Sequence, residues 1–263
     1  MFLKKISLHP KLAAAIDFVF GVAFLLALTQ VNSKKKLLAW IGGCFLVWAV
    51  LVFVTYYPAQ IKKITHWLTL AWFAVGMVLW LIFIDWRVAW YVVGLVFVLL
   101  PAVSFWLIPT EHKVLTFVTK SYRRWRFLMS VAALSGIFSA VGASFTLQLF
   151  SPFPWWLSFV GALVAGGVAM WWWQEYDLGF SRRAWLTAGV LTLLFLELDL
   201  VVRLWPLGYF ASGLLLAWCW YLLWLIFRFY LSPEGLIWRK QRPFLIFNGI
   251  LLFVYLVFLV RWR

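Results

Sequence analysis

Charged residues are scarce in this chain. They make up 12% of its 263 residues, whereas hydrophobic residues make up 66%. Ordinary soluble domains carry about 25% charged and about 45–50% apolar residues. The polar residues are therefore too few to cover a core of this size, which excludes an ordinary soluble domain and predicts that much of the apolar surface faces lipid.

Cysteine is nearly absent too. Cys44 and Cys219 both lie within apolar runs, so a disulfide framework is excluded. The histidines His9, His66 and His112 occur singly beside apolar runs and are predicted to be ordinary interfacial residues on the cytoplasmic side. Because no Cys/His cluster accompanies them, we expect neither a metal site nor a cofactor.

Signatures of several membrane-protein activities are missing. No apolar run contains a lysine, which excludes a retinal Schiff base, and no arginine ladder of a voltage sensor is present. Neither a phosphate-binding glycine loop nor a Gly-x-Ser-x-Gly nucleophile elbow occurs. Enzymatic activity is not predicted, and an intramembrane lipid-modifying enzyme is the third alternative.

Apolar blocks of about 20 residues dominate the chain, and this is the helix length that crosses ~30 Å of hydrocarbon. The sequence predicts an all-α polytopic membrane protein with about nine transmembrane helices. The predicted spans are Leu12–Gln30, Leu37–Tyr57, Trp67–Ile84, Val88–Leu107, Phe127–Leu147, Trp155–Trp173, Ala184–Leu204, Leu207–Phe227 and Phe244–Val260. Eight remain if the seventh, which carries three charged residues, lies on the membrane surface instead.

The basic residues predict the orientation. With the N-terminus inside, sixteen Lys and Arg fall on the cytoplasmic side and six on the other, which favours N-in and C-out. Only the run Lys34–Lys36 opposes this assignment. The net charge of +15 is thus interpreted as a topology signal and as anchoring to anionic headgroups, with no nucleic-acid partner. Short loops without glycosylation sequons favour the cytoplasmic membrane of a prokaryote.

We predict a single membrane domain, 1–263, with two longer cytoplasmic connectors. Apolar residues recur at helical spacing in 110–126, which is typical of an amphipathic helix in the headgroup layer. Its basic residues are expected to contact lipid headgroups: Lys113, Lys120, Arg123, Arg124 and Arg126. The second connector, 228–243, is predicted to be short and cytoplasmic.

Small residues recur at three- and four-residue spacing in the fifth and sixth spans, including Gly136 and Gly166. Such spacing lets helix backbones approach closely in lipid. It predicts a tight hairpin of these two spans. Tryptophans near span ends, such as Trp155 and Trp172, predict interfacial belts.

Four ionisable residues fall within predicted spans and are candidates for an intramembrane polar site: Asp17, Glu197, Asp199 and Arg203. Asp199 and Arg203 are four residues apart and are expected to pair. Glu197 lies about 200° around the helix from Asp199, so the two carboxylates cannot face the same neighbour. Asp17 and Glu197 therefore remain candidates for handling ions, protons or polar ligands. Asn248 is expected to form an interhelical hydrogen bond.

Two functions fit these features. The first is a non-catalytic accessory or scaffold subunit of a larger membrane complex, with membrane-protein partners or self-association. The alternative is a transporter or channel for a lipid or other hydrophobic solute, in which Asp17 and Glu197 act directly. The sparse polar groups favour a hydrophobic cargo over an ion.

Overall fold

The computed structural model describes residues 7–30, 33–57, 61–84, 86–110, 120–150, 155–174, 181–232, 235 and 237–259. Within these ranges the chain is all-helical, as predicted, apart from an isolated bridge between Leu8 and Thr55. The helices are α1 (Pro10–Leu28), α2 (Lys34–Val54), α3 (Lys63–Phe83), α4 (Arg87–Trp106), α5 (Lys120–Phe150), α6 (Trp155–Gln174), α7 (Arg182–Leu204), α8 (Tyr209–Leu231) and α9 (Trp238–Val254), followed by the π-helix η2 (Tyr255–Leu259).

Eight helices in the described part of the chain, α1 to α8, are long and apolar enough to cross a membrane. This confirms the prediction of an all-α chain whose helices are long and apolar enough to be membrane spans. The seventh predicted span is a continuous helix of 23 residues despite its three charges. The seventh span is therefore not the weak one. The last apolar helix, over Gln241–Val257, is shorter than the eight candidate spans.

Local capping fixes several helix starts. Pro10 is the first residue of α1, and the His9 side chain accepts a hydrogen bond from the backbone N–H of Lys11. Ser33 and Ser181 cap α2 and α7 in the same way. These positions are the polar residues that separate the apolar runs, which is why the predicted and observed boundaries agree to within a few residues.

The two predicted connectors differ in length from the observed ones. Residues 111–119, including Lys113, lie outside the described residues, and α5 already begins at Lys120. α9 begins at Trp238 and continues through Pro243, its sixth residue. Proline there cannot donate to the carbonyl of Arg239, and its ring crowds that carbonyl, but this affects only the second turn of α9. Placement of both connectors at the cytoplasmic surface stays a prediction.

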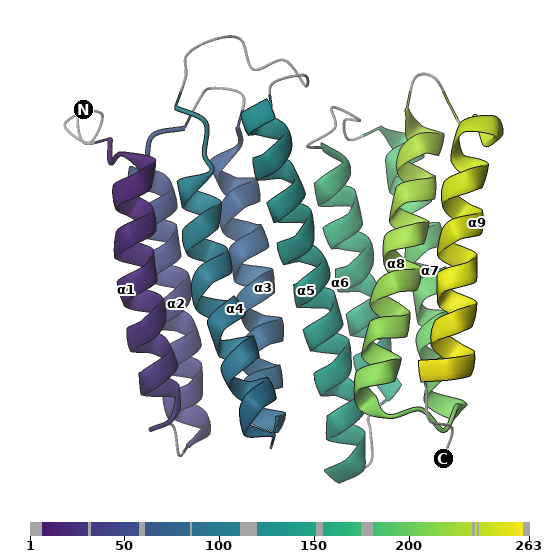
Figure 1. Ribbon diagram of the computed structural model, residues 1–263, viewed down its shortest axis with the longest axis horizontal. Coiled ribbons are helices and arrows are strands. Elements are labelled where there is room, and N and C mark those ends of the chain that lie inside the picture. The colour runs from purple at the N-terminus through teal and green to yellow at the C-terminus, as the bar shows by residue number, and fades with distance from the viewer. Residues whose placement is uncertain are drawn as a thin grey trace. The chain divides into compact units, whose positions relative to one another are not determined.

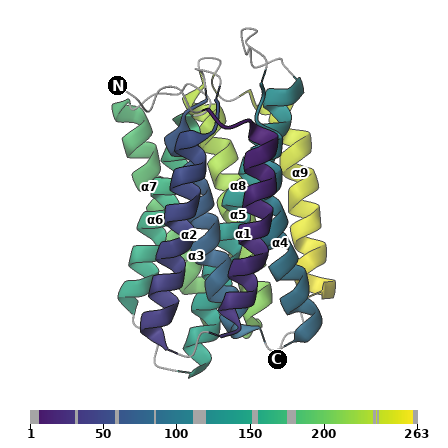
Figure 2. The ribbon, with the colours of Figure 1, turned by 90° about the vertical axis from the view of Figure 1, so that its left-hand side faces the viewer.

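The chain divides into two compact units, Met1–Gly136 and Ile137–Arg263, with the boundary inside α5. In the first unit, α1 packs against α4 and α2, and α3 packs against α2 and α4 (Figures 1 and 2). The segment before α1 pairs with the end of α2, because Leu8 donates to the carbonyl of Val54 (2.9 Å) and accepts from the N–H of Tyr56 (3.0 Å). The assignment of 1–263 as one domain stays a prediction.

In the second unit, α7 packs closely against α6 and also against α8 (Figure 1). Gly166 of α6 faces α7, where a Cβ would come within 3.2 Å of the Ala188 carbonyl oxygen. Gly136 of α5 lies instead against α3, where a Cβ would come within 3.2 Å of the Phe73 Cα. These two glycines therefore pack α6 against α7 and α5 against α3, and a tight hairpin of α5 and α6 stays a prediction.

Buried and half-buried tryptophans join neighbouring helices in both units. Their indole N–H groups donate across helix pairs: Trp40 to the Phe24 carbonyl (2.8 Å), Trp67 to the Phe45 carbonyl (3.2 Å), Trp173 to the Trp224 carbonyl (3.2 Å) and Trp220 to the Ala165 carbonyl (3.1 Å). Trp155 is exposed, as expected of a belt residue, but Trp172 is buried. Tryptophans of this chain thus have two roles: some lie exposed near helix ends, and others donate hydrogen bonds between helices.

Candidate functional site

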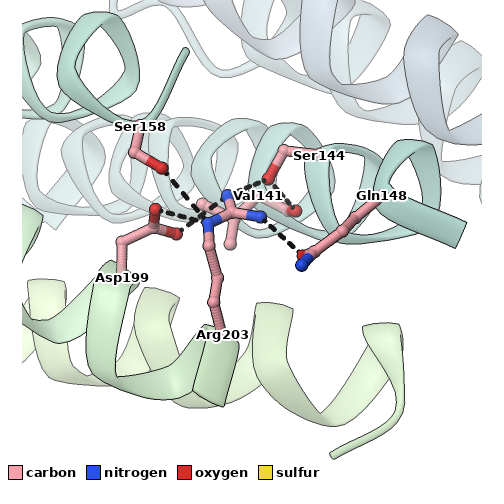
Figure 3. Close-up of polar contacts among 6 residues, drawn as sticks. All are labelled: Val141, Ser144, Gln148, Ser158, Asp199 and Arg203. Carbon is pink, nitrogen blue, oxygen red and sulfur yellow. Dashed lines mark hydrogen bonds and ion pairs between the residues drawn. The ribbon is translucent and has the colours of Figure 1, made fainter. Parts of the chain in front are cut away.

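The most extensive polar site surrounds Arg203, one residue before the end of α7 (Figure 3). Its Nε donates to Oδ2 of Asp199 at 2.8 Å and also to Oγ of Ser158 at 3.2 Å. One terminal nitrogen donates to Oγ of Ser144 (3.0 Å) and to Oδ1 of Asp199 (3.2 Å), and the other to Oε1 of Gln148 (3.2 Å). The site therefore joins α5, α6 and α7.

This cluster is internally satisfied. The side chains of Arg203 and Asp199 are 9% and 5% exposed, and the guanidinium carbon lies 4.3 Å from the centre of the Phe145 ring. The Ser144 hydroxyl in turn donates a hydrogen bond to the carbonyl of Val141 (2.7 Å) (Figure 3). Because each guanidinium nitrogen already donates and the adjacent carboxylate balances the charge, the arrangement suits a structural tie better than an anion-binding site.

Glu197 differs from its neighbours on α7. Its side chain is exposed, and Asp199, on nearly the opposite face, is buried. The residues three and four positions away on either side, where a helical partner would stand, are all leucine or valine. A charge near the centre of a spanning helix costs on the order of 3 kcal/mol. Glu197 is thus a carboxylate on an apolar outer surface.

Asp17 is buried in the first unit, with 3% of its surface exposed. Trp48 of α2 donates its indole N–H to Oδ1 of Asp17 at 2.7 Å. Asp17 lies seven residues from the start of α1, about 10 Å along the helix. No ion pair to Asp17 is found among the residues that the structure describes. The carboxyl group therefore links α1 to α2 through a neutral donor.

The structure corrects the prediction that His66 is an ordinary interfacial residue: it is fully buried near the start of α3 and is the centre of a fourth polar site. His66 is fully buried and bonds through Nδ1 to the hydroxyl of Tyr57 and through Nε2 to Oγ of Ser104 (2.7 Å). Ser104 in turn donates to the Pro101 carbonyl at 2.6 Å. The network joins the segment before α3 to α3 and α4.

The directions of these hydrogen bonds follow from the last one. The Ser104 hydroxyl uses its hydrogen to donate to the Pro101 carbonyl, so it can only accept a hydrogen bond from His66. The imidazole hydrogen is therefore on Nε2. Nδ1 is then an acceptor, and Tyr57 donates to it. Burial raises the pKa of the Tyr57 phenol well above its usual range, which keeps that proton in place. Ser104 is therefore not poised as a nucleophile, because its proton points away from the imidazole.

Aromatic rings enclose the same histidine. Ring centres lie 4.8 Å away for Phe105 and 5.7 Å for Trp125, and both side chains are fully buried. The indole nitrogen of Trp125 has no hydrogen-bond partner among the described residues. A buried, aromatic environment of this kind supports a structural role for the His66 network.

Three arginines of α5 and Asn248 of α9 were also predicted to have a role in the membrane. Arg123 and Arg124 are exposed in the first turns of α5, as headgroup contact requires. Arg126 is 7% exposed, and its guanidinium carbon lies 5.3 Å from the centre of the Tyr122 ring. Asn248 accepts from the indole N–H of Trp218 at 3.1 Å and joins α9 to α8, as expected of an interhelical group.

No group of three or more His, Cys, Asp or Glu side chains in the described ranges could hold a metal ion. No protein-family model, no curated protein and no solved structure matches this chain.

Proposed function

We propose that this chain is a non-catalytic accessory or scaffold subunit of a larger membrane complex. It is inserted with its N-terminus in the cytoplasm, and α9 serves as a ninth span. The charge asymmetry of sixteen inner against six outer Lys and Arg supports this orientation. α9 and η2 run on to Leu259, and the stretch without charged residues from Pro243 to Leu259 is about 26 Å of helix at 1.5 Å per residue, close to the ~30 Å of hydrocarbon, which supports a ninth crossing.

One observation carries the proposal. Several polar side chains inside the helices bond to neighbouring helices of the same unit, as in the pairs Asp17–Trp48, His66–Ser104 and Trp218–Asn248 and in the Arg203 cluster. A conducting or transporting path needs polar groups that are open to the cargo. Groups consumed in interhelical ties stabilise a rigid framework, which is what a scaffold subunit requires. The proposed setting is the cytoplasmic membrane of a prokaryote.

Native mass spectrometry after extraction from the native membrane in a mild detergent tests the proposal. We expect the tagged chain to emerge with one or more protein partners in fixed stoichiometry. An unrelated membrane protein with the same tag, extracted in parallel, is the control for nonspecific capture. Recovery of the chain alone, or with only a defined lipid or small molecule, would contradict the subunit role.

The alternative function is transport of a lipid or other hydrophobic solute. It is favoured by the buried carboxylate of Asp17, for which the structure describes an indole partner and no cation. A carboxyl group of this kind could exchange a proton or contact a polar headgroup during transport. The two functions differ in what they require of Asp17.

Replacement of Asp17 by asparagine separates them. Asparagine keeps an acceptor for the Trp48 indole and removes the charge, so a structural tie predicts a free energy of unfolding within about 1 kcal/mol of wild type. Trp48→Phe, which removes the donor, is expected to cost about 1–3 kcal/mol more than Asp17→Asn. Both are measured by SDS titration in mixed micelles.

Lipid translocation in reconstituted vesicles supplies the functional readout. Under the scaffold proposal, wild-type protein and Asp17→Asn both leave the flipping rate of a fluorescent phospholipid at the level of protein-free vesicles. Acceleration by wild type that is lost in Asp17→Asn would favour transport and assign Asp17 to the mechanism.

A further inference from the structure

The exposed side of α7 has a regular pattern. Its exposed side chains include Leu186, Val190, Leu193, Glu197, Leu200 and Leu204. Their spacing alternates between four and three residues, which is the a/d pattern of a seam between two helices. We call these six residues the α7 seam. An apolar stripe alone is ordinary on a helix that faces lipid, but a carboxylate within it is not.

Glu197 is too deep to reach water along its own helix. Seven residues separate it from Leu204, the last residue of α7, or about 10 Å. Long Lys and Arg side chains can extend to the interface from such a depth, whereas a glutamate side chain is shorter. The nearby Arg203 cannot neutralise it, because it lies on another face of α7 and is bonded to Asp199. No described basic side chain within the unit Ile137–Arg263 is paired with Glu197, so we expect the compensating group to come from a helix outside this unit.

We propose that the α7 seam is the docking surface for a transmembrane helix of another protein that carries an arginine or lysine at the depth of Glu197. This inference rests on the proposed role as a complex subunit and names the chemistry of the partner. Apolar side chains of the seam pack against that helix, and the Glu197 carboxylate accepts hydrogen bonds from the basic group, in the pairing that charges within membranes require.

A second copy of this chain fits the seam less well. In a symmetric pair about an axis normal to the membrane, each Glu197 faces its own counterpart at the same depth. A partner copy would have to supply a basic group at the depth of Glu197. Among the described residues on the side of the membrane where α7 ends, Arg203 is the basic residue that lies beyond the first turn of a helix. It is already held by Asp199, Ser144 and Gln148. Charge complementarity therefore favours a different protein.

A defined peptide probe tests the docking surface. The full chain, labelled at its N-terminus, is reconstituted in phosphatidylcholine vesicles with a labelled leucine/alanine helix of about 21 residues that crosses the bilayer. One peptide carries arginine seven residues from its end, and a second carries leucine at that position. Energy transfer between the labels reports association. Both peptides insert in either orientation, so the comparison between them is independent of orientation.

We expect the arginine peptide to associate roughly tenfold more tightly than the leucine peptide with wild-type chain. In Glu197→Gln the preference should fall to within about twofold. Leu193→Ala, which alters packing on the same seam but keeps the carboxylate, should retain the preference. Equal association of the two peptides with wild type, or an arginine preference that survives in Glu197→Gln, would overturn the proposal. Self-association of the chain that depends on Glu197 would overturn it too, since the occupant would then be a second copy.

The native complex distinguishes failure of this inference from failure of the proposed function. If partners remain with Glu197→Gln in native mass spectrometry, and the peptides show no arginine preference, the subunit role stands and the α7 seam is not its docking site. If the wild-type chain is recovered alone, the proposed function fails whatever the peptides show.

Discussion

Replacement of Arg203 by methionine is expected to lower the free energy of unfolding by about 3–5 kcal/mol, the usual cost of leaving one member of a buried ion pair unpaired. Methionine keeps much of the aliphatic length that packs near Phe145 but removes all the donors. Asp199, 4% exposed, then keeps a carboxylate with its main partner missing. Ser144, Ser158 and Gln148 also lose the donor that joins them.

The cost should be asymmetric between the two partners. Asp199→Leu leaves the guanidinium beside Ser144 and Gln148, and Arg203 lies one residue before the end of α7, where a long side chain can extend toward the interface. We therefore expect Asp199→Leu to cost about 1–2 kcal/mol less than Arg203→Met. The double variant Asp199→Leu/Arg203→Met should recover most of the stability, because apolar replacement of a whole buried pair is often neutral.

SDS titration in mixed micelles measures these free energies. Arg183→Met is the matched control, because Arg183 is an exposed arginine in the first turn of the same helix. It should change the free energy of unfolding by less than about 0.5 kcal/mol. A cost of Arg203→Met no larger than that of Arg183→Met would show that the cluster does not hold α5, α6 and α7 together.

The spans were predictable because one physical quantity fixes their length. A helix must cover ~30 Å of hydrocarbon, so apolar run length alone locates α1 to α8 to within a few residues, except that α5 begins at Lys120 and not at Phe127. The contact between Asp199 and Arg203 was predictable for a similar reason, since spacing of four residues on a helix brings side chains together. Both properties are local in sequence.

The partners of these residues were not predictable from the same information. Ser144 and Ser158 reach Arg203 from 59 and 45 residues away, and only the packing of α5 and α6 brings them there. The neighbours of the small residues were not predictable for the same reason. Small residues show that a close approach occurs, but their spacing does not identify the partner, and Gly166 faces α7.

Whether a carboxylate is buried or exposed was not predictable from the sequence either. Asp17 and Glu197 were equivalent candidates in the sequence, since neither carboxylate has a predicted ion-pair partner. In the structure Asp17 is buried against Trp48, and Glu197 is exposed on α7. The first therefore belongs to the internal framework, and the second belongs to the surface where a partner would bind.

His66 was overlooked because a single histidine at the edge of a span is usually interfacial. Its partners Tyr57 and Ser104 lie 9 and 38 residues away. A helical prediction of α3 and α4 does not show that they meet. The one local signal was Ser104, three residues after Pro101, where a hydroxyl can satisfy a carbonyl near the proline.

Replacement of His66 by alanine is expected to cost about 3–5 kcal/mol of the free energy of unfolding. The imidazole is fully buried, so its removal leaves a cavity among Phe105, Trp125 and Tyr57. It also leaves the Tyr57 hydroxyl without its acceptor, and a buried polar group left unpaired adds about 1–3 kcal/mol. Ile64→Ala, at a 51% exposed position two residues earlier in α3, is the matched control and should cost less than about 1 kcal/mol.

A double-mutant cycle separates the hydrogen bond from the cavity. His66→Phe fills the space but removes both nitrogens, and Tyr57→Phe removes the donor to Nδ1. Each single variant leaves one buried polar group unpaired, and the double variant removes both groups. The cost of Tyr57→Phe should therefore be smaller by at least about 1 kcal/mol in the His66→Phe background than in wild type. Additive costs would mean that the two side chains stabilise the unit independently, in which case the histidine contributes only through its packing against the aromatic rings.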